Sequence, residues 1–175
     1  ITINYNNKDF FDFEKSLLQR AFNPTTSYEG NIKGAINLYM LFYIKHRTKV
    51  AACFRTLYRI YDLLDNAELK EKIKKNYLKI IRAQLTDSEL FFIRYNGMTY
   101  YGDNFTKYIN KYNVIKHLPA FDLLEFKDWW KDLTQIERTG INIVFHNSTR
   151  LLRRILLKRD SDIVFRIPEE NLKYG

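Results

Sequence analysis

Glycine and proline are scarce in this sequence, at six and three among 175 residues. These two residues mark most turns and breaks between elements. Their scarcity favours long elements joined by short corners, which helices satisfy better than a meander of strands. We therefore predict an all-α fold, in which residues 1–175 form a single bundle of about seven or eight helices.

Cysteine and long apolar runs are equally scarce. A lone Cys53 excludes an intramolecular disulfide framework and suits a reducing cytoplasm. The most apolar run, residues 35–44, is shorter than the ~20 residues of a membrane-spanning helix. We interpret that run as a buried core helix. Ile1 opens a polar stretch rather than a signal peptide.

Patterns that carry catalysis or bind metals are missing as well. His46, His117 and His146 are far apart, and none has a second His or Cys three or four positions away. We therefore expect no metal site and no cofactor. No nucleophile elbow or phosphate-binding glycine loop is present. Cys53 lies in an apolar stretch and is expected to be a buried structural thiol. These patterns weigh against an enzyme.

Positive charge and aromatic residues are abundant instead. The formal net charge of +9 favours anionic partners, whether nucleic acid, acidic protein or anionic lipid. One basic stretch near the C-terminus alternates with leucines, which is typical of a core helix with a solvated face, of an interfacial helix on anionic lipid, or of a phosphate-contacting helix. No signature of nucleic-acid reading accompanies it, so nucleic acid is the less favoured partner. The basic residues are Arg150, Arg153, Arg154, Lys158 and Arg159.

Apolar periodicity and breaker residues give a map of elements. Residues 24–34 read as a loop, and a helix over 35–44 either continues through 46–50 or breaks there. Ile163–Phe165 could form a short strand. Further helices are predicted over residues 9–22, 50–65, 68–85, 103–116 and 121–133, with one or two more over 134–158.

Residues 77–97 predict two helices joined by a sharp corner. Tyr77, Ile80 and Leu85 lie on one apolar stripe, which ends at the corner. Thr86 and Glu89 then have the spacing of a capping box, in which each side chain bonds the backbone N–H of the other residue. Gly97 is expected to end the second helix in a left-handed conformation.

With the Arg-Thr-Leu-Tyr segment upstream, this stretch resembles the putative phage abortive infection protein family of bacteria over roughly residues 35–118. The resemblance implies a component of a bacterial anti-phage defence system, a non-enzymatic effector or sensor that stops growth of the infected cell. Members typically carry membrane-spanning segments near the N-terminus. This chain would then be the cytoplasmic portion of a longer protein anchored in the inner membrane. The matching residues are Arg55, Thr56, Leu57, Tyr58, Tyr77, Arg82, Ala83, Gln84, Leu85, Glu89, Tyr95 and Asn96.

The polar residues of this motif are the candidate site, and two interpretations stay open. In the first they form a structural network in which Arg82 pairs with Glu89, because a buried charge must be paired. In the second they bind a phage or host protein that acts as the trigger. A homo-oligomer fits either interpretation. The candidate residues are Arg55, Tyr58, Arg82, Gln84, Glu89, Tyr95 and Asn96.

Two other classes of function stay open, a toxin ribonuclease of helical fold and a plain protein-interaction module. A helical class of toxin ribonucleases uses an Arg-x4–6-His motif. Here Arg138 and His146 are separated by seven residues, which misses that spacing. A plain protein-interaction module is the remaining alternative.

Overall fold

The computed structural model describes residues 7–26, 28–119 and 122–127, and every element within them is helical. This result confirms the all-α class, whereas the predicted number of helices is not confirmed. Arg138, His146, the basic stretch 150–159 and the suggested strand at 163–165 lie outside the described residues. The elements are α1 Asn7–Ala21, α2 Tyr28–Asn66, α3 Glu71–Ala83, α4 Asp87–Gly97, the 3-10 helix η1 Tyr100–Gly102, α5 Asp103–Tyr112 and the 3-10 helix η3 Leu124–Phe126.

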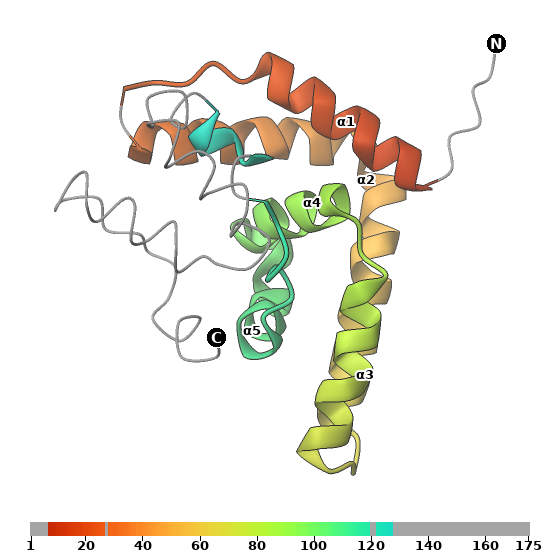
Figure 1. Cartoon of the computed structure of the whole chain (residues 1–175). Coiled ribbons are helices and arrows are strands. Elements are labelled where there is room, and N and C mark those ends of the chain that lie inside the picture. The colour runs from red at the N-terminus through yellow and green to blue at the C-terminus, as the bar shows by residue number, and fades with distance from the viewer. Residues whose placement is uncertain (1–6, 27, 120–121, 128–175) are drawn as a thin grey trace, which may run out of the picture.

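Helix α2 is the scaffold on which the other elements pack (Figure 1). It bends at His46, whose φ of −113° and ψ of 18° are not helical. The first half of α2 lies beside α1, and the second half turns away to pair with α3 (Figure 1). Helices α4 and α5 lie in the angle between the two halves (Figure 1). Of the two possibilities left open for residues 46–50, the structure shows the first, a helix that continues through them with a kink at His46.

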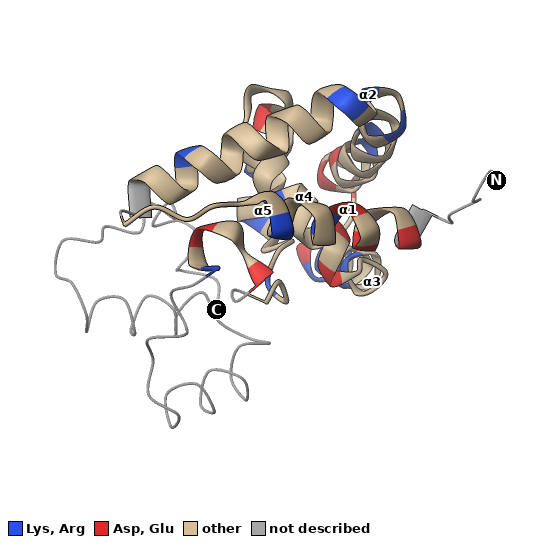
Figure 2. Ribbon diagram, turned by 90° about the horizontal axis from the view of Figure 1, so that it is seen from above, with Lys and Arg blue, Asp and Glu red and all other residues tan. Residues whose placement is uncertain are grey.

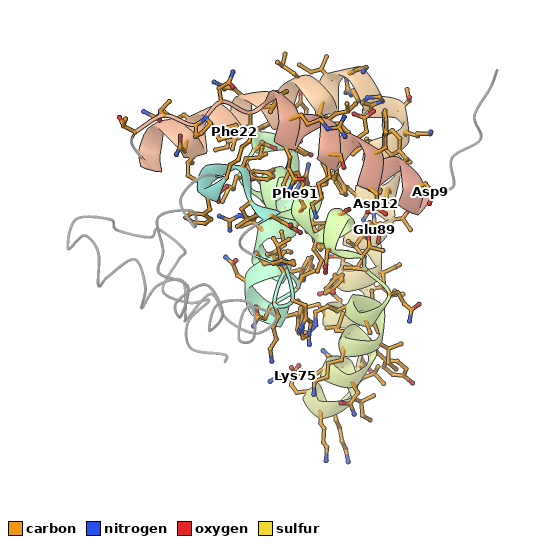
Figure 3. All side chains as sticks on the ribbon, turned by 45° about the horizontal axis from the view of Figure 1, so that its top comes forward. Asp9, Asp12, Phe22, Lys75, Glu89 and Phe91 are labelled. Carbon is orange, nitrogen blue, oxygen red and sulfur yellow. The ribbon has the colours of Figure 1, made fainter. Side chains whose placement is uncertain are left out.

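Helix α4 is the centre of the core. Every residue from Leu90 to Asn96 is buried. Its aromatic side chains meet both neighbouring helices: the Phe92 ring centroid lies 4.3 Å from that of Phe42 in α2, and Phe91 lies beneath α1 (Figure 3). Because partners surround it on several sides, α4 lacks the single apolar stripe of a surface helix.

The corner before α4 has the predicted capping box. The backbone N–H of Glu89 donates to Thr86 Oγ1 at 3.2 Å, and the Thr86 N–H donates to Glu89 Oε2 at 2.8 Å. Figure 3 places Glu89 at this N-terminal end of α4. Gly97 does end the helix, but its predicted left-handed conformation is wrong, since no described glycine has a positive φ. Its role is close approach, because a Cβ there would lie 2.9 Å from Ile109 Cδ1 of α5.

Three other sequence expectations are wrong where the structure describes them. Residues 28–34 are helical rather than a loop, and Gly34 lets the Phe22 ring approach α2 closely, 3.3 Å from where a Cβ would lie. The predicted inward stripe of α3 is split, because Leu78 is buried while Tyr77 and Ile80 are 50% and 60% exposed. Within residues 122–127, η3 replaces the predicted α-helix.

Candidate functional site: a basic, aromatic cleft between α2 and the α4–α5 corner

Two of the predicted site residues, Tyr95 and Asn96, belong to a buried polar network. Asn96 Nδ2 donates to the Tyr39 hydroxyl at 2.8 Å, which joins α4 to α2. The Tyr95 hydroxyl donates to the Glu125 carboxylate and accepts the backbone N–H of Leu124 at 2.8 Å. Burial, reinforced by the negative charge of Glu125, raises the pKa of Tyr95 well above its ordinary value. The tyrosine is therefore a neutral donor at physiological pH.

Glu125 was not predicted from the sequence, yet it organises this network. Arg94 Nη2 lies 2.5 Å from Glu125 Oε1, and the Glu125 side chain is fully buried. A buried carboxylate is tolerated when a cation and hydrogen-bond donors satisfy it. Arg94 and Tyr95 supply both, so η3 is bonded to α4 through charged and neutral donors.

The predicted Arg82–Glu89 ion pair is wrong, because within the described residues each of the two bonds to other groups. Glu89 is engaged in its own capping box with Thr86. Arg82 Nη1 donates to the backbone carbonyls of Tyr112 and Asn113, at 3.3 and 3.1 Å. A cation on those carbonyls satisfies acceptors that the end of α5 leaves open and complements the negative end of its dipole. Arg82 thus contacts the end of α5, whereas Glu89 contacts the start of α4.

The other predicted residues separate into two groups. Gln84, just after α3, is exposed. Arg55, Tyr58 and Asn96, in contrast, line one cleft of about 320 Å³ between α2 and the α4–α5 corner. The full lining is Tyr43, Ala51, Phe54, Arg55, Tyr58, Arg59, Asn96, Tyr101, Asn104 and Phe105.

The cleft is basic. Arg55 and Arg59 are one helical turn apart on α2, where basic positions recur along the helix (Figure 2). Within the described residues neither arginine forms an ion pair, and none of the described lining residues carries a carboxylate. Like charges at this spacing repel by a few tenths of a kcal/mol. An anion held between them would relieve that repulsion.

The cleft is also aromatic at one side. The rings of Tyr43 and Tyr101 are stacked, with centroids 4.5 Å apart and an interplanar angle of 27°. Tyr43 is buried whereas Tyr101 is 43% exposed, so Tyr43 supports a ring that still faces solvent. On the other side the Arg59 guanidinium lies 5.6 Å from the centroid of the Tyr58 ring.

Gly102 holds Tyr101 in this position. The Gly102 N–H donates to the carbonyl of Thr99 at 2.9 Å, which closes the turn of η1. A Cβ at Gly102 would lie 2.1 Å from the backbone oxygen of Asn96. Only glycine lets η1 pack so closely against the end of α4, and that packing brings Tyr101 beside Asn96 at the cleft.

Several cleft residues were missed from the sequence. Arg59 could have been found, because it lies one turn after Arg55 on the same predicted helix. Tyr43 and Tyr101 carried no local signal, since their stacking depends on how the chain returns to α2 after α4.

Cys53 is exposed rather than buried as predicted. Desolvation and the charge of Glu89 raise the pKa of its thiol, which favours the protonated form.

Among the described residues, no group of three or more His, Cys, Asp or Glu side chains could hold a metal ion. None of the described helices has the length and apolar character needed to cross a membrane.

The described residues therefore form an all-α fold that carries a small basic, aromatic cleft. Residues 45–123 match the family described as "Putative phage abortive infection protein", which confirms the resemblance found in the sequence. The matched segment includes all seven candidate motif residues and every lining residue of the cleft except Tyr43. The family name connects this segment with phage abortive infection. No curated protein and no solved structure matches the chain at a significant level.

Proposed function

We propose that this protein is a non-enzymatic component of a bacterial abortive-infection system and that it recognises its trigger at the cleft between α2 and the α4–α5 corner. One observation carries the proposal. Arg55 and Tyr58 from the first piece of the family motif and Asn96 from its last piece, all singled out in the sequence, line the same cleft. That cleft lies almost wholly within the segment that matches the family.

The rest of the motif supports the cleft rather than adding chemistry to it. Arg82 fixes the end of α5, and Thr86 and Glu89 fix the start of α4. These two helices carry Phe105 and Asn96, which form one wall of the cleft. The lining offers guanidinium, amide and phenol donors, which suit holding a ligand. A sensor role therefore fits the residues better than catalysis does.

Infection of cells that carry the gene tests this proposal. Abortive infection should lower the number of plaques while infected cells stop growing at high multiplicity of infection. The control is the same host with the gene silenced by an early stop codon. Equal plaque numbers in both hosts would contradict a role in defence, and protection with full recovery of the infected cells would contradict an abortive mechanism.

A further inference from the structure

We infer that the ligand of this cleft is a nucleotide, bound through its phosphate by Arg55 and Arg59 and through its base by Tyr101. The inference rests on the proposed function for its biological meaning, because it names the ligand of the same cleft. Its physical basis is independent of the family. It follows from charge, ring geometry and size.

The charge of the cleft selects an anion. Arg55 and Arg59 lie one turn apart on one helix, without a carboxylate partner among the described residues. Guanidinium groups are planar forks that bind phosphate through paired hydrogen bonds. Two forks at this spacing can reach the same phosphate, whereas a neutral ligand would leave their mutual repulsion in place.

The aromatic side of the cleft selects a planar ring. Tyr101 is supported from behind by the buried Tyr43 at 4.5 Å and is 43% exposed. Any of the nucleobases can stack on such a ring, because every base has a π-face. Asn104 is exposed at the same cleft and offers both a donor and an acceptor to the edge of a base.

The size of the cleft selects a small molecule. Its volume of about 320 Å³ is large enough for a single ring system with a phosphate. Ligand sites in proteins usually measure ~300–1,000 Å³. A double helix or a folded protein domain would need a broad surface instead. The cleft has a floor, formed by the buried Tyr43 and Asn96, and a rim at the partly exposed Tyr101.

Titration calorimetry with the full 175-residue chain tests this inference. The probes are adenosine and guanosine 5′-monophosphate, inorganic phosphate and a poly-glutamate peptide. We expect both nucleotides to bind, with an affinity that falls as salt is added. Inorganic phosphate should bind about tenfold more weakly, the worth of one stacked base. Bound nucleotide should also raise the melting temperature.

Matched variants locate the site. Arg55→Gln and Arg59→Gln should each weaken nucleotide binding by about tenfold, the worth of one charge-assisted contact. Tyr101→Leu should weaken binding of nucleotide but not of phosphate. The controls are Arg20→Gln in the last turn of α1 and Tyr77→Leu on α3, both exposed and outside the cleft. They should leave every affinity unchanged, and circular dichroism should show that all variants remain folded.

Each other outcome overturns the inference. If inorganic phosphate binds as tightly as the nucleotides, the base adds no affinity, and the proposed stacking on Tyr101 is wrong. Binding of poly-glutamate alone replaces the nucleotide with an acidic protein. No binding of any probe, or binding that the control variants weaken equally, removes the site. Plaque assays separate the two proposals. If protection depends on Arg55 but no nucleotide binds, the proposed function stands and the inference fails. If nucleotide binds but the cleft variants leave protection unchanged, the inference stands and the proposed role of the cleft in defence fails.

Discussion

The buried Arg94–Glu125 pair offers a sharp test of how α4 and η3 are held together. Arg94 Nη2 and Glu125 Oε1 are 2.5 Å apart, and the two side chains are 7% and 0% exposed. Arg94→Met leaves a buried carboxylate whose remaining hydrogen-bond donor, among the described residues, is the neutral Tyr95 hydroxyl. Glu125→Gln leaves a buried cation facing an amide. Removal of one member of such a pair costs about 3–5 kcal/mol.

The double variant separates the cost of a lone charge from the worth of the pair. With Met at 94 and Gln at 125 no charge remains, and the amide can still accept from the Tyr95 hydroxyl. We therefore expect the double variant to be more stable than either single variant, within roughly 1–2 kcal/mol of the parent. For a chain of this length, a loss of 3 kcal/mol lowers the melting temperature by roughly 6–12 °C.

Urea unfolding of the four proteins measures these free energies. The matched control is Lys111→Met at the pair with Asp65, where the two side chains are 51% and 19% exposed and the loss should be only about 0–1 kcal/mol. Single variants that stay within ~1 kcal/mol of the parent, with additive effects in the double variant, would refute the account of a buried and coupled pair.

Three further predictions follow from local geometry and burial. Thr86→Ala should lower the free energy of unfolding by ~1 kcal/mol through loss of the cap, with Asp87→Ala as the exposed neighbour for comparison in urea unfolding. Gly102→Ala should destabilise far more than Gly97→Ala, because its Cβ meets backbone at 2.1 Å whereas that of Gly97 meets the tip of a side chain at 2.9 Å; equal melting temperatures would contradict this reasoning. Burial raises the pKa of Tyr61 to about 12, so between pH 10 and 12 the unfolded chain loses a proton that the folded protein keeps. Stability should therefore fall with rising pH across that window, and less steeply in Tyr61→Phe.

The capping box shows what the sequence could predict. Thr86 and Glu89 are three residues apart, and their bonds depend on the conformation of one turn. Local spacing therefore determined both partners. The burial of α4 can be predicted for a similar reason, because the apolar residues Leu90, Phe91, Phe92 and Ile93 follow one another directly.

The partners of Arg82 and Arg94 show what the sequence could not predict. Arg82 bonds backbone carbonyls 30 and 31 residues further along the chain. Arg94 bonds a carboxylate that is also 31 residues away. Such contacts depend on the path of the chain, and a backbone carbonyl carries no signature in the sequence. Pairing Arg82 with Glu89, a carboxylate close to it in the sequence, was therefore wrong.

The cleft lies between these extremes. Arg55 and Tyr58 were found through a motif on a single helix, but only the return of the chain through η1 brings Tyr101 to Tyr43. Gly102 controls that return, because a side chain there would collide with the end of α4. In the sequence this glycine reads as an ordinary turn residue before a helix.

Plaque counts with a doubly substituted cleft test the central claim most directly. Arg55→Gln/Arg59→Gln removes two positive charges from the cleft, and Arg20→Gln/Lys72→Gln removes two from exposed positions outside it. Both proteins should have the melting temperature of the parent, because all four side chains are exposed. We predict that the cleft variant loses protection against phage while the control retains it. Full protection by a folded cleft variant would contradict the account.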